Sequence, residues 1–378
     1  MSGGWERRPF EDCIERVTYT NRIQRRDFLE NGAFPIVSQE EGLVNGYWNN
    51  SADLFRVQGP VVLFGDHTRA LKYVDFDFVL GADGVKILKP KSCLDPRFFY
   101  YALMAVEIKS LGYARHYRQL KELEIGFPPI AQQQRIVRIL DEAFEGIATA
   151  KANAEQNLRN TTALFKSHLN AAFTGHDWPV ARLGDLADKV TKGTTPTSVG
   201  HAFIDDGINF VKVESITKTG RFIREKFAHI SPECHADLAR SQLAAGDILF
   251  SIAGALGRTA LVTDDILPAN TNQALAIIRL NPNPGLLRAF VLKALETGVV
   301  LEQIEQFRGG AAQQNLSLAQ VRDFEIAMPS LVEQQQIVAN LERFFDETEQ
   351  LASIFEEKIT ALEALKMSLL HNAFSGQL

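Results

Sequence analysis

The segment FGDHTR at positions 64–69 groups the side chains most capable of chemistry. Asp66 stands next to His67, and a carboxylate beside an imidazole is the usual partnership for general acid–base catalysis. The segment also follows an apolar run and begins at a glycine turn. A turn that carries acid, imidazole, hydroxyl and guanidinium groups suits base edges and phosphates better. We therefore expect DNA contact here, with a purely structural turn and a catalytic pair as open alternatives.

Other patterns that would indicate an enzyme are weak. Asp95 with Glu107 and Lys109 superficially resembles a nuclease set, but the segment 95–111 has the apolar spacing of a helix, and such a set needs a strand facing a metal. The segment NPNP at 281–284 lacks the aromatic residue that holds a flipped adenine in methyltransferases. No phosphate-binding GxxxxGKS or GxxxxGKT loop occurs. The sequence thus predicts no catalytic residue, no metal and no cofactor.

Polar residues in the first part of the chain extend the candidate surface. Arg22 and Arg25 lie in a polar stretch, and guanidinium forks match phosphates and guanine edges. Gln39 follows a short predicted strand and suits adenine, whereas Arg115 suits the DNA backbone. A solvated basic face is the alternative interpretation. The predicted DNA contacts in this part are Arg22, Arg25, Gln39, Asp66, His67, Thr68, Arg69, Lys72 and Arg115.

The second part of the chain offers three further candidate segments. A loop rich in glycine, proline and hydroxyl groups follows Lys192, and such loops present donors to phosphate. Lys212 and Glu214 alternate in FVKVES, which predicts that both lie on one strand face, where Glu214 accepts from cytosine or only neutralises Lys212. The segment 308–315 combines glycines with amides and suits a groove, with an ordinary surface loop as the alternative. The predicted contacts are Lys192, Thr194, Thr195, Lys212, Glu214, Arg308, Gln313 and Asn315.

An internal repeat determines which elements must position these residues. FPPIAQQQRIVRIL (127–140) matches MPSLVEQQQIVANL (328–341), and LFKSHLNAAFTG (164–175) matches LKMSLLHNAFSG (365–376). Both matches have the same offset of 201 residues, without a gap. An inserted residue would rotate one end of a helix about 100° relative to the other. We therefore expect two long helices of matched length.

The apolar spacing of these helices predicts a coiled coil. Prolines stand before each start and glycines after each end, as helix boundaries favour. The spacing alternates between three and four, apart from Thr348 and Lys358. Two independent helices are the alternative. The second copy predicts a seam of Ile337, Leu341, Phe344, Leu351, Phe355, Leu362, Leu365 and Leu369, and the first copy one of Ile136, Leu140, Ala143, Ile147, Ala150, Ala154, Thr161 and Leu164.

The segments before the two helices also correspond, but loosely. GPVVLF (59–64) matches GDILFS (246–251), each a glycine turn leading into an apolar strand. The region from Trp5 to Thr18 resembles that from Trp178 to Thr191. Elsewhere the two segments differ. A duplicated binder that reads two different half-targets would have this pattern.

Composition leaves this interpretation open. The 378 residues carry a net charge of −6, but residues 328–378 alone hold 8 acidic and 3 basic residues, so the globular segments are nearly balanced. A balanced domain can still present a basic face. The three cysteines make no CxxC pair, which disfavours a zinc site or a disulfide framework. We find no signal peptide and no apolar run long enough for a membrane, and expect a cytoplasmic protein without membrane contact.

The combination of motifs resembles the specificity subunit of type I restriction–modification systems. The Pro-x-x-x-x-Gln-Gln start of each long helix, the AFxG end, and the head pattern WPVARLGDLADKVTKGTTP (178–196) carry the resemblance, which spans essentially the whole chain. It implies an α+β fold with two globular mixed α/β target-recognition domains, separated by two antiparallel helices in a coiled coil with a pseudo-twofold repeat. We expect domains at 1–127 and 176–327, with spacer helices at 128–175 and 328–378.

The resemblance also implies a function. A non-catalytic subunit of this kind binds double-stranded DNA, reads a bipartite target with a fixed gap, and directs two adenine methyltransferase subunits and nuclease/translocase subunits. A non-enzymatic coiled-coil scaffold with two protein-binding heads is the competing hypothesis, and an autonomous nuclease is a third.

Overall fold

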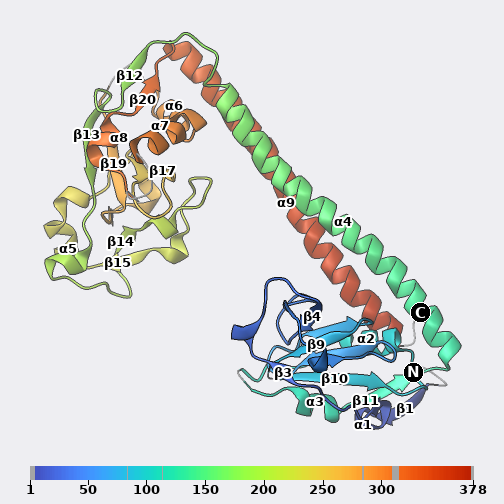
Figure 1. The fold of residues 1–378 in the computed structure, drawn as a ribbon. Coiled ribbons are helices and arrows are strands. Elements are labelled where there is room, and N and C mark those ends of the chain that lie inside the picture. Colours follow the sequence, from blue (N-terminus) through green and yellow to red (C-terminus); the bar gives the residue numbers. More distant parts are fainter. Residues whose placement is uncertain (1–4, 83, 113, 283–284, 309–314, 376–378) are drawn as a thin grey trace. The chain divides into compact units, whose positions relative to one another are not determined.

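The computed structural model describes residues 5–82, 84–112, 114–282, 285–308 and 315–375, except for the side chain of Arg308. The chain divides into two compact units, Met1–Gln156 with Phe355–Leu378, and Asn157–Ile354. Each unit contains one globular head and part of both long helices, which are labelled α4 and α9 in Figure 1. Sheets and helices together confirm the predicted mixed α+β fold.

In its described residues the first head contains three sheets, some of whose strands are labelled in Figure 1. A two-stranded sheet pairs β1 with β11, and a four-stranded sheet has the order β2-β10-β7-β8. A five-stranded sheet has the order β3-β9-β4-β5, with β6 on β9, and β4 runs parallel to β9. The strands are β1 Glu6–Pro9, β2 Ile14–Glu15, β3 Arg22–Ile23, β4 Phe34–Val37, β5 Gly46–Trp48, β6 Leu54–Phe55, β7 Val61–Gly65, β8 Leu71–Val74, β9 Phe78–Gly81, β10 Val85–Pro90 and β11 Glu124–Phe127. The short helices are α1 Phe10–Cys13, α2 Pro96–Met104 and α3 Tyr117–Lys121.

The second head has corresponding sheets. Its orders are β12-β20, β13-β19-β16-β17 and β15-β14-β18, with β14 parallel to β18. The strands are β12 Val180–Arg182, β13 Ala187–Lys192, β14 Ile208–Val211, β15 Ala228–Ile230, β16 Ile248–Ser251, β17 Thr259–Leu261, β18 Ala269–Thr271, β19 Leu275–Leu280 and β20 Glu325–Ala327. The helices are α5 Pro232–Asp237, α6 Arg288–Leu295, α7 Gly298–Arg308 and α8 Leu318–Arg322. The repeat seen in the sequence thus extends to strand order and direction.

A central strand in each head separates two apolar cores. In β7, Val62 and Phe64 belong to the core beneath α2, whereas Val61 and Leu63 belong to the core on the opposite face. Side chains alternate between the faces of a strand, so a run that is buried on both faces must be apolar throughout. In β16, Leu249 faces one core while its two neighbours face another. The predicted strands after Gly59 and Gly246 are therefore confirmed.

The predicted long helices are also confirmed. α4 spans Ile130–Ala171 and α9 spans Leu331–Ser375. In the first unit, Lys151 of α4 forms an ion pair with Glu363 of α9. In the second unit, the ring centroids of Phe165 and Phe345 lie 5.2 Å apart. Within each unit the two helices therefore pack against each other.

The predicted apolar seam is only partly correct. In α4 the predicted Leu164 is 53% exposed, and Leu169 is buried instead. The other predicted seam residues that are buried in α4 are Ile136, Leu140, Ile147, Ala154 and Thr161. In α9 the predicted Leu351 and Leu365 are 44% and 47% exposed, whereas Leu341 is fully buried. The half-buried position next to Leu351 is Ala352, which means that one of the two heptad positions lies one residue later than predicted. The apolar spacing did not reveal this register, because a small residue such as Ala352 occupies the half-buried position and hydrophobicity alone assigns the neighbouring leucine to the seam.

Two local predictions are wrong. The helix predicted over 95–111 ends at Met104, so Glu107 and Lys109 lie outside it. β14 ends at Val211, so Lys212 and Glu214 do not share a strand face. The chain turns there because the Ser215 hydroxyl accepts the Lys212 N–H at 3.3 Å and a short 3-10 turn follows. Serine competes with strand pairing in this way.

Candidate nucleic-acid interface

A basic cavity in the first head brings together five of the predicted residues. It has a volume of about 360 Å³ and is formed by the ends of β4, β7 and β9, by β3 and β10, and by the loop before α3. It is lined by Arg22, Gln39, Asp66, His67, Gly84, Lys86 and Arg115. Three of these side chains are cationic and one is a carboxylate, so the cavity suits an anionic ligand.

Asp66 connects two of the loops that form this cavity. The side chain is buried, and its Oδ1 accepts the Tyr117 N–H at 2.7 Å. Its carbonyl oxygen lies 2.8 Å from the His116 backbone nitrogen and 2.9 Å from His116 Nδ1. Because His116 Nε2 accepts the Leu111 N–H at 3.0 Å, the ring proton resides on Nδ1. The buried Asp66 thus holds the segment that carries Arg115.

Gln39 connects a third loop to the same place. Its Oε1 accepts the His67 N–H at 3.2 Å, and its carbonyl oxygen accepts the Thr68 hydroxyl at 2.6 Å. The two loops approach closely at Gly65, where an added Cβ would lie 3.0 Å from Gln39 Cβ of the other loop and 2.2 Å from the Thr68 hydroxyl oxygen of its own turn. A larger side chain at this position would push the loops apart. The glycine in the FGDHTR segment therefore serves this close approach.

The cations of the cavity come from separate elements. Arg22 lies in β3, and its guanidinium carbon lies 5.0 Å from the centre of the Tyr19 ring. The Lys86 ammonium lies 5.3 Å from the centre of the Tyr117 ring. Lys86 was not among the predicted contacts. In β10 only Lys86 and Lys89 are half-buried and the other four residues are buried. A lysine inside an apolar run such as VKIL is the sequence signal that could have identified Lys86.

The remaining predicted residues of the first head bind other parts of that head. Arg25 forms an ion pair with Glu40 at 2.9 Å, and Arg69 donates to the Ile108 carbonyl at 3.1 Å. Lys72 is buried, with its ammonium 2.9 Å from Asn45 Oδ1, and burial lowers its pKa to about 8. These three residues order the loops in the structure, and their contact with DNA stays a prediction.

In the second head, the predicted loop after Lys192 packs tightly against a neighbouring strand. At Gly193 an added Cβ would lie 1.9 Å from the Thr271 carbonyl oxygen, so only glycine fits. The Thr194 N–H donates to that oxygen at 3.1 Å, and the Thr195 hydroxyl bonds Gln273 Oε1. Hydroxyl groups and amides therefore gather at this edge of the head.

Two residues at this edge were missed by the sequence analysis. Arg240 is exposed and donates to the Thr194 hydroxyl at 3.2 Å, and Gln273 is the exposed partner of Thr195. Both come from loops distant in sequence, and no local pattern singles them out. The Thr271 hydroxyl also donates to the Val211 carbonyl at 2.8 Å, which joins this edge to the turn of Lys212.

The other predicted residues of the second head are placed as follows. The Lys212 ammonium lies 4.6 Å from the centre of the Phe203 ring, and Glu214 is exposed on the following turn. Asn315 is exposed next to Leu316, whose N–H binds the Ile252 carbonyl at 2.9 Å. Gln313 and the side chain of Arg308 lie outside the described residues.

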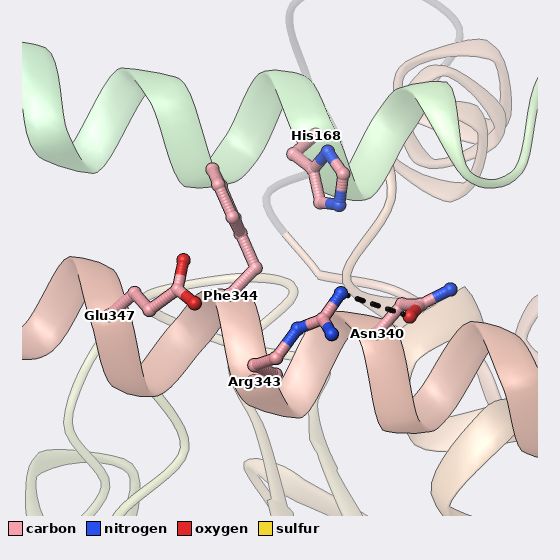
Figure 2. A pocket seen from close by; sticks show the side chains of 5 residues that line it. All are labelled: His168, Asn340, Arg343, Phe344 and Glu347. Atoms are coloured by element: carbon pink, nitrogen blue, oxygen red, sulfur yellow. Dashed lines mark hydrogen bonds between the residues drawn. The ribbon is translucent and has the colours of Figure 1, made fainter.

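A cavity of about 360 Å³ lies between the long helices of the second unit (Figure 2). It is lined by His168 of α4 and by Asn340, Arg343, Phe344 and Glu347 of α9. The His168 ring lies 4.2 Å from that of Phe344, and Arg343 donates to Asn340 at 3.4 Å. The ring contact joins the two helices, the Arg343–Asn340 bond lies within α9, and neither forms an acid–base or nucleophilic set. Among the residues that the structure describes, no group of three or more His, Cys, Asp or Glu side chains could hold a metal ion.

The family model for the type I restriction modification DNA specificity domain matches the chain twice, over residues 3–158 and 175–360. The chain belongs to this family. It carries two recognition domains of the specificity subunit, and membership places it among the non-catalytic subunits of these systems.

Individual relatives agree with this family. The type I restriction enzyme EcoBI specificity subunit of Escherichia coli is 25% identical over 392 residues, which cover 94% of this chain and 79% of that protein. A solved chain from work on complex assembly and conformational transition of the type I R-M system has a TM-score of 0.74 at 19% identity, covering 100% of this chain and 99% of that chain. The HsdS subunit from Thermoanaerobacter tengcongensis has a TM-score of 0.53 at 19% identity, with 100% and 98% covered. The two solved structures show the shared fold.

A separate question is whether any helix of the chain could cross a membrane. None of the described helices of this specificity subunit is long and apolar enough to cross a membrane.

Proposed function

We propose that this specificity subunit reads a bipartite DNA target with a fixed gap, one half with each head. The observation that carries the proposal is that both heads share a core strand order but differ in the residues at corresponding loops. The loop between β4 and β5 contributes Gln39 to a basic cavity, whereas the turn after β14 contributes Lys212 beside Phe203. Base identity is read by side-chain donors and acceptors, so different side chains on one scaffold favour different bases.

The long helices are the proposed ruler between the half-sites. α4 has 42 residues, which at 1.5 Å per residue corresponds to roughly 60 Å. Lys151 pairs with Glu363 in one unit and Phe165 with Phe345 in the other, so higher residue numbers in α4 pair with lower ones in α9. This order supports an antiparallel coiled coil with pseudo-twofold symmetry. The predicted domains at 1–127 and 176–327 and the spacers at 128–175 and 328–378 belong to this proposal.

The proposed partners are two adenine methyltransferase subunits and nuclease/translocase subunits. Support comes from the family, and from a solved chain of similar fold that belongs to work on complex assembly of the type I R-M system. The chemistry would belong to these partners, and this chain would supply the position on double-stranded DNA.

Mapping methylated adenines tests the proposal directly. The full chain is expressed with methyltransferase subunits in a host that lacks adenine methylation, and the modified sites are sequenced. We expect one split motif with two defined halves and a constant gap. A continuous motif, or methylation without sequence preference, would contradict the two-head assignment.

Salt dependence separates DNA reading from the competing protein-binding scaffold. Neutralising several phosphates releases counterions, so the affinity for DNA should fall steeply between about 50 mM and 200 mM salt. A scaffold whose heads bind protein would bind no DNA duplex at either salt concentration.

A further inference from the structure

The first glutamine of the PxxxxQQ motif is fully buried at the start of each long helix. Gln133 is the fourth residue of α4 and Gln334 the fourth residue of α9, and both are 0% exposed. The next residues, Gln134 and Gln335, are exposed. A buried amide is stable only when its two donors and its acceptor find partners. The partners of the two buried glutamines are therefore informative.

Gln133 binds the first head through three backbone groups. Its Nε2 donates to the carbonyl oxygens of Pro128 at 2.8 Å and Cys93 at 2.9 Å. Its Oε1 accepts the N–H of Asp95 at 2.8 Å. Asp95 is the N-cap residue of α2, so the amide ties the start of α4 to the start of a head helix.

Gln334 makes the same three bonds in the second head. Its Nε2 donates to the carbonyl oxygens of Pro329 and Gly285, each at 3.0 Å. Its Oε1 accepts the N–H of Leu287 at 2.9 Å, and Leu287 is the N-cap residue of α6. We call Gln133 and Gln334 with these partners the amide clamps. Two identical clamps in heads that differ elsewhere indicate a shared geometrical requirement.

The end of the other long helix packs on the same head helix. In the first unit, the ring centroids of Phe374 in α9 and Phe98 in α2 lie 5.1 Å apart. In the second unit, Phe173 follows the end of α4, and its ring centroid lies 5.0 Å from that of Phe290 in α6. Each head is thus held at one helix start by an amide clamp and at the other helix end by an aromatic contact. The PxxxxQQ and AFxG motifs are the two halves of one junction.

We propose that Gln133 and Gln334 are positioning residues that fix the direction in which each head leaves the helices, and thereby the gap length that the chain accepts. This inference rests on the proposed function. Three hydrogen bonds around one buried amide leave little rotational freedom between the long helix and the head helix. A chain that lacks a clamp would still present its half-site reader, but over a wider range of angles.

The test compares DNA duplexes whose gap is changed by one base pair in either direction. The two half-sites come from the methylation map, and affinities are measured with the full chain in complex with its methyltransferase subunits. The variants are Gln133→Met and Gln334→Met, which keep the side-chain volume but remove the amide. Gln134→Met and Gln335→Met introduce the same change at the adjacent exposed positions and serve as controls.

We expect the wild-type chain and both controls to prefer their own gap by roughly tenfold or more, comparable to the cost of one mismatched pair. In the two clamp variants this preference should fall to about twofold, because a loosened site tolerates displacement. Affinity for a duplex carrying one half-site should stay unchanged. In hydrogen exchange, the peptide containing Asp95 should exchange faster in Gln133→Met, and the peptide containing Leu287 in Gln334→Met.

Two outcomes are distinguishable. If the wild-type chain itself shows no gap preference, the proposed bipartite reading is wrong. If the wild-type chain discriminates and the folded clamp variants discriminate equally, the role of the glutamines is overturned. Should a methionine variant fail to fold, Gln133→Asn and Gln334→Asn, which keep the amide but shorten its reach, are judged by the same two readouts.

Discussion

Polar side chains in the heads fall into two groups. The buried Asp66 and the exposed Arg69 hold loops of their own head together. Arg22 and Arg115 are exposed in the basic cavity of the first head, Arg240 is exposed at an edge of the second head, and we predict that these three contact DNA. Sequence patterns identified residue types that suit DNA, but both kinds of residue are polar and lie in the same segments. Neither residue type nor exposure alone separates a side chain that holds a loop from one that is predicted to contact DNA; the partners of each side chain in the structure are also needed.

Lys86 and Arg240 test this division. Lys86→Ala should weaken binding to the half-site read by the first head, and Arg240→Ala should weaken binding to the other half-site. Each substitution should reduce the slope of log affinity against log salt concentration by about one, as expected for the loss of one phosphate contact. The measurement is a competition between duplexes that carry one half-site each, at several salt concentrations. Equal loss at both half-sites would contradict the assignment of either residue to one head.

Lys72 should give the protein a characteristic pH dependence. Burial lowers its pKa to about 8 from the ordinary 10.5, an effect that Glu40 opposes. Between these values the unfolded chain holds a proton that the folded chain has lost, so stability rises with pH across this window, by up to about 3 kcal/mol. Denaturant unfolding at pH 8 and pH 10 should show this rise, and Lys72→Met should flatten it. An identical rise in the variant would exclude Lys72 as its cause.

At the scale of the elements, the repeat predicted more than periodicity did. The matched motifs placed α4 and α9 correctly, because a proline before a helix and a glycine after it limit the chain locally. The heptad register of α9 was wrong at Leu351 and Leu365, which are exposed while the residue after each is half-buried. The turn after β14 was missed because a serine hydroxyl, not a glycine or proline, ends that strand.

The observed register of α9 can be tested by two leucines. Leu341 is fully buried and Leu351 is 44% exposed. Leu341→Ala should lower the free energy of unfolding by about 3 kcal/mol, because it removes buried methyl groups and leaves a cavity. Leu351→Ala should cost under about 1 kcal/mol. Denaturant unfolding of the two variants provides the measurement, and equal losses would restore the register expected from sequence.

At the scale of the whole molecule, the sequence predicted the duplication and the family, but not how a head is attached. In the sequence, PxxxxQQ and AFxG are repeated motifs at the starts and ends of the long helices. Their roles became clear only with the bonds of Gln133 and Gln334 and with the contacts of Phe374 and Phe173. These contacts join residues that are far apart along the chain, and no local pattern indicates such pairs.

The proposed ruler predicts the effect of an insertion. Four residues added after Ala154 would lengthen α4 by about 6 Å and rotate its far end by about 40° relative to its start. We expect a changed gap or a loss of assembly, with both half-sites unchanged in sequence. The methylation map of the variant measures this directly. A change in the bases of either half-site would contradict independent reading by the two heads.

The amide clamps have a consequence for how such a chain can evolve. Each glutamine binds only main-chain atoms of its head, such as the Cys93 carbonyl and the Leu287 N–H. Main-chain atoms are the same in every sequence, so substitutions in a head do not disturb the hydrogen bonds that hold it. One head can accumulate mutations, or be replaced by recombination with a foreign one, while its attachment persists. Novel specificities would then arise by exchange of modules, without redesign of the frame that carries them.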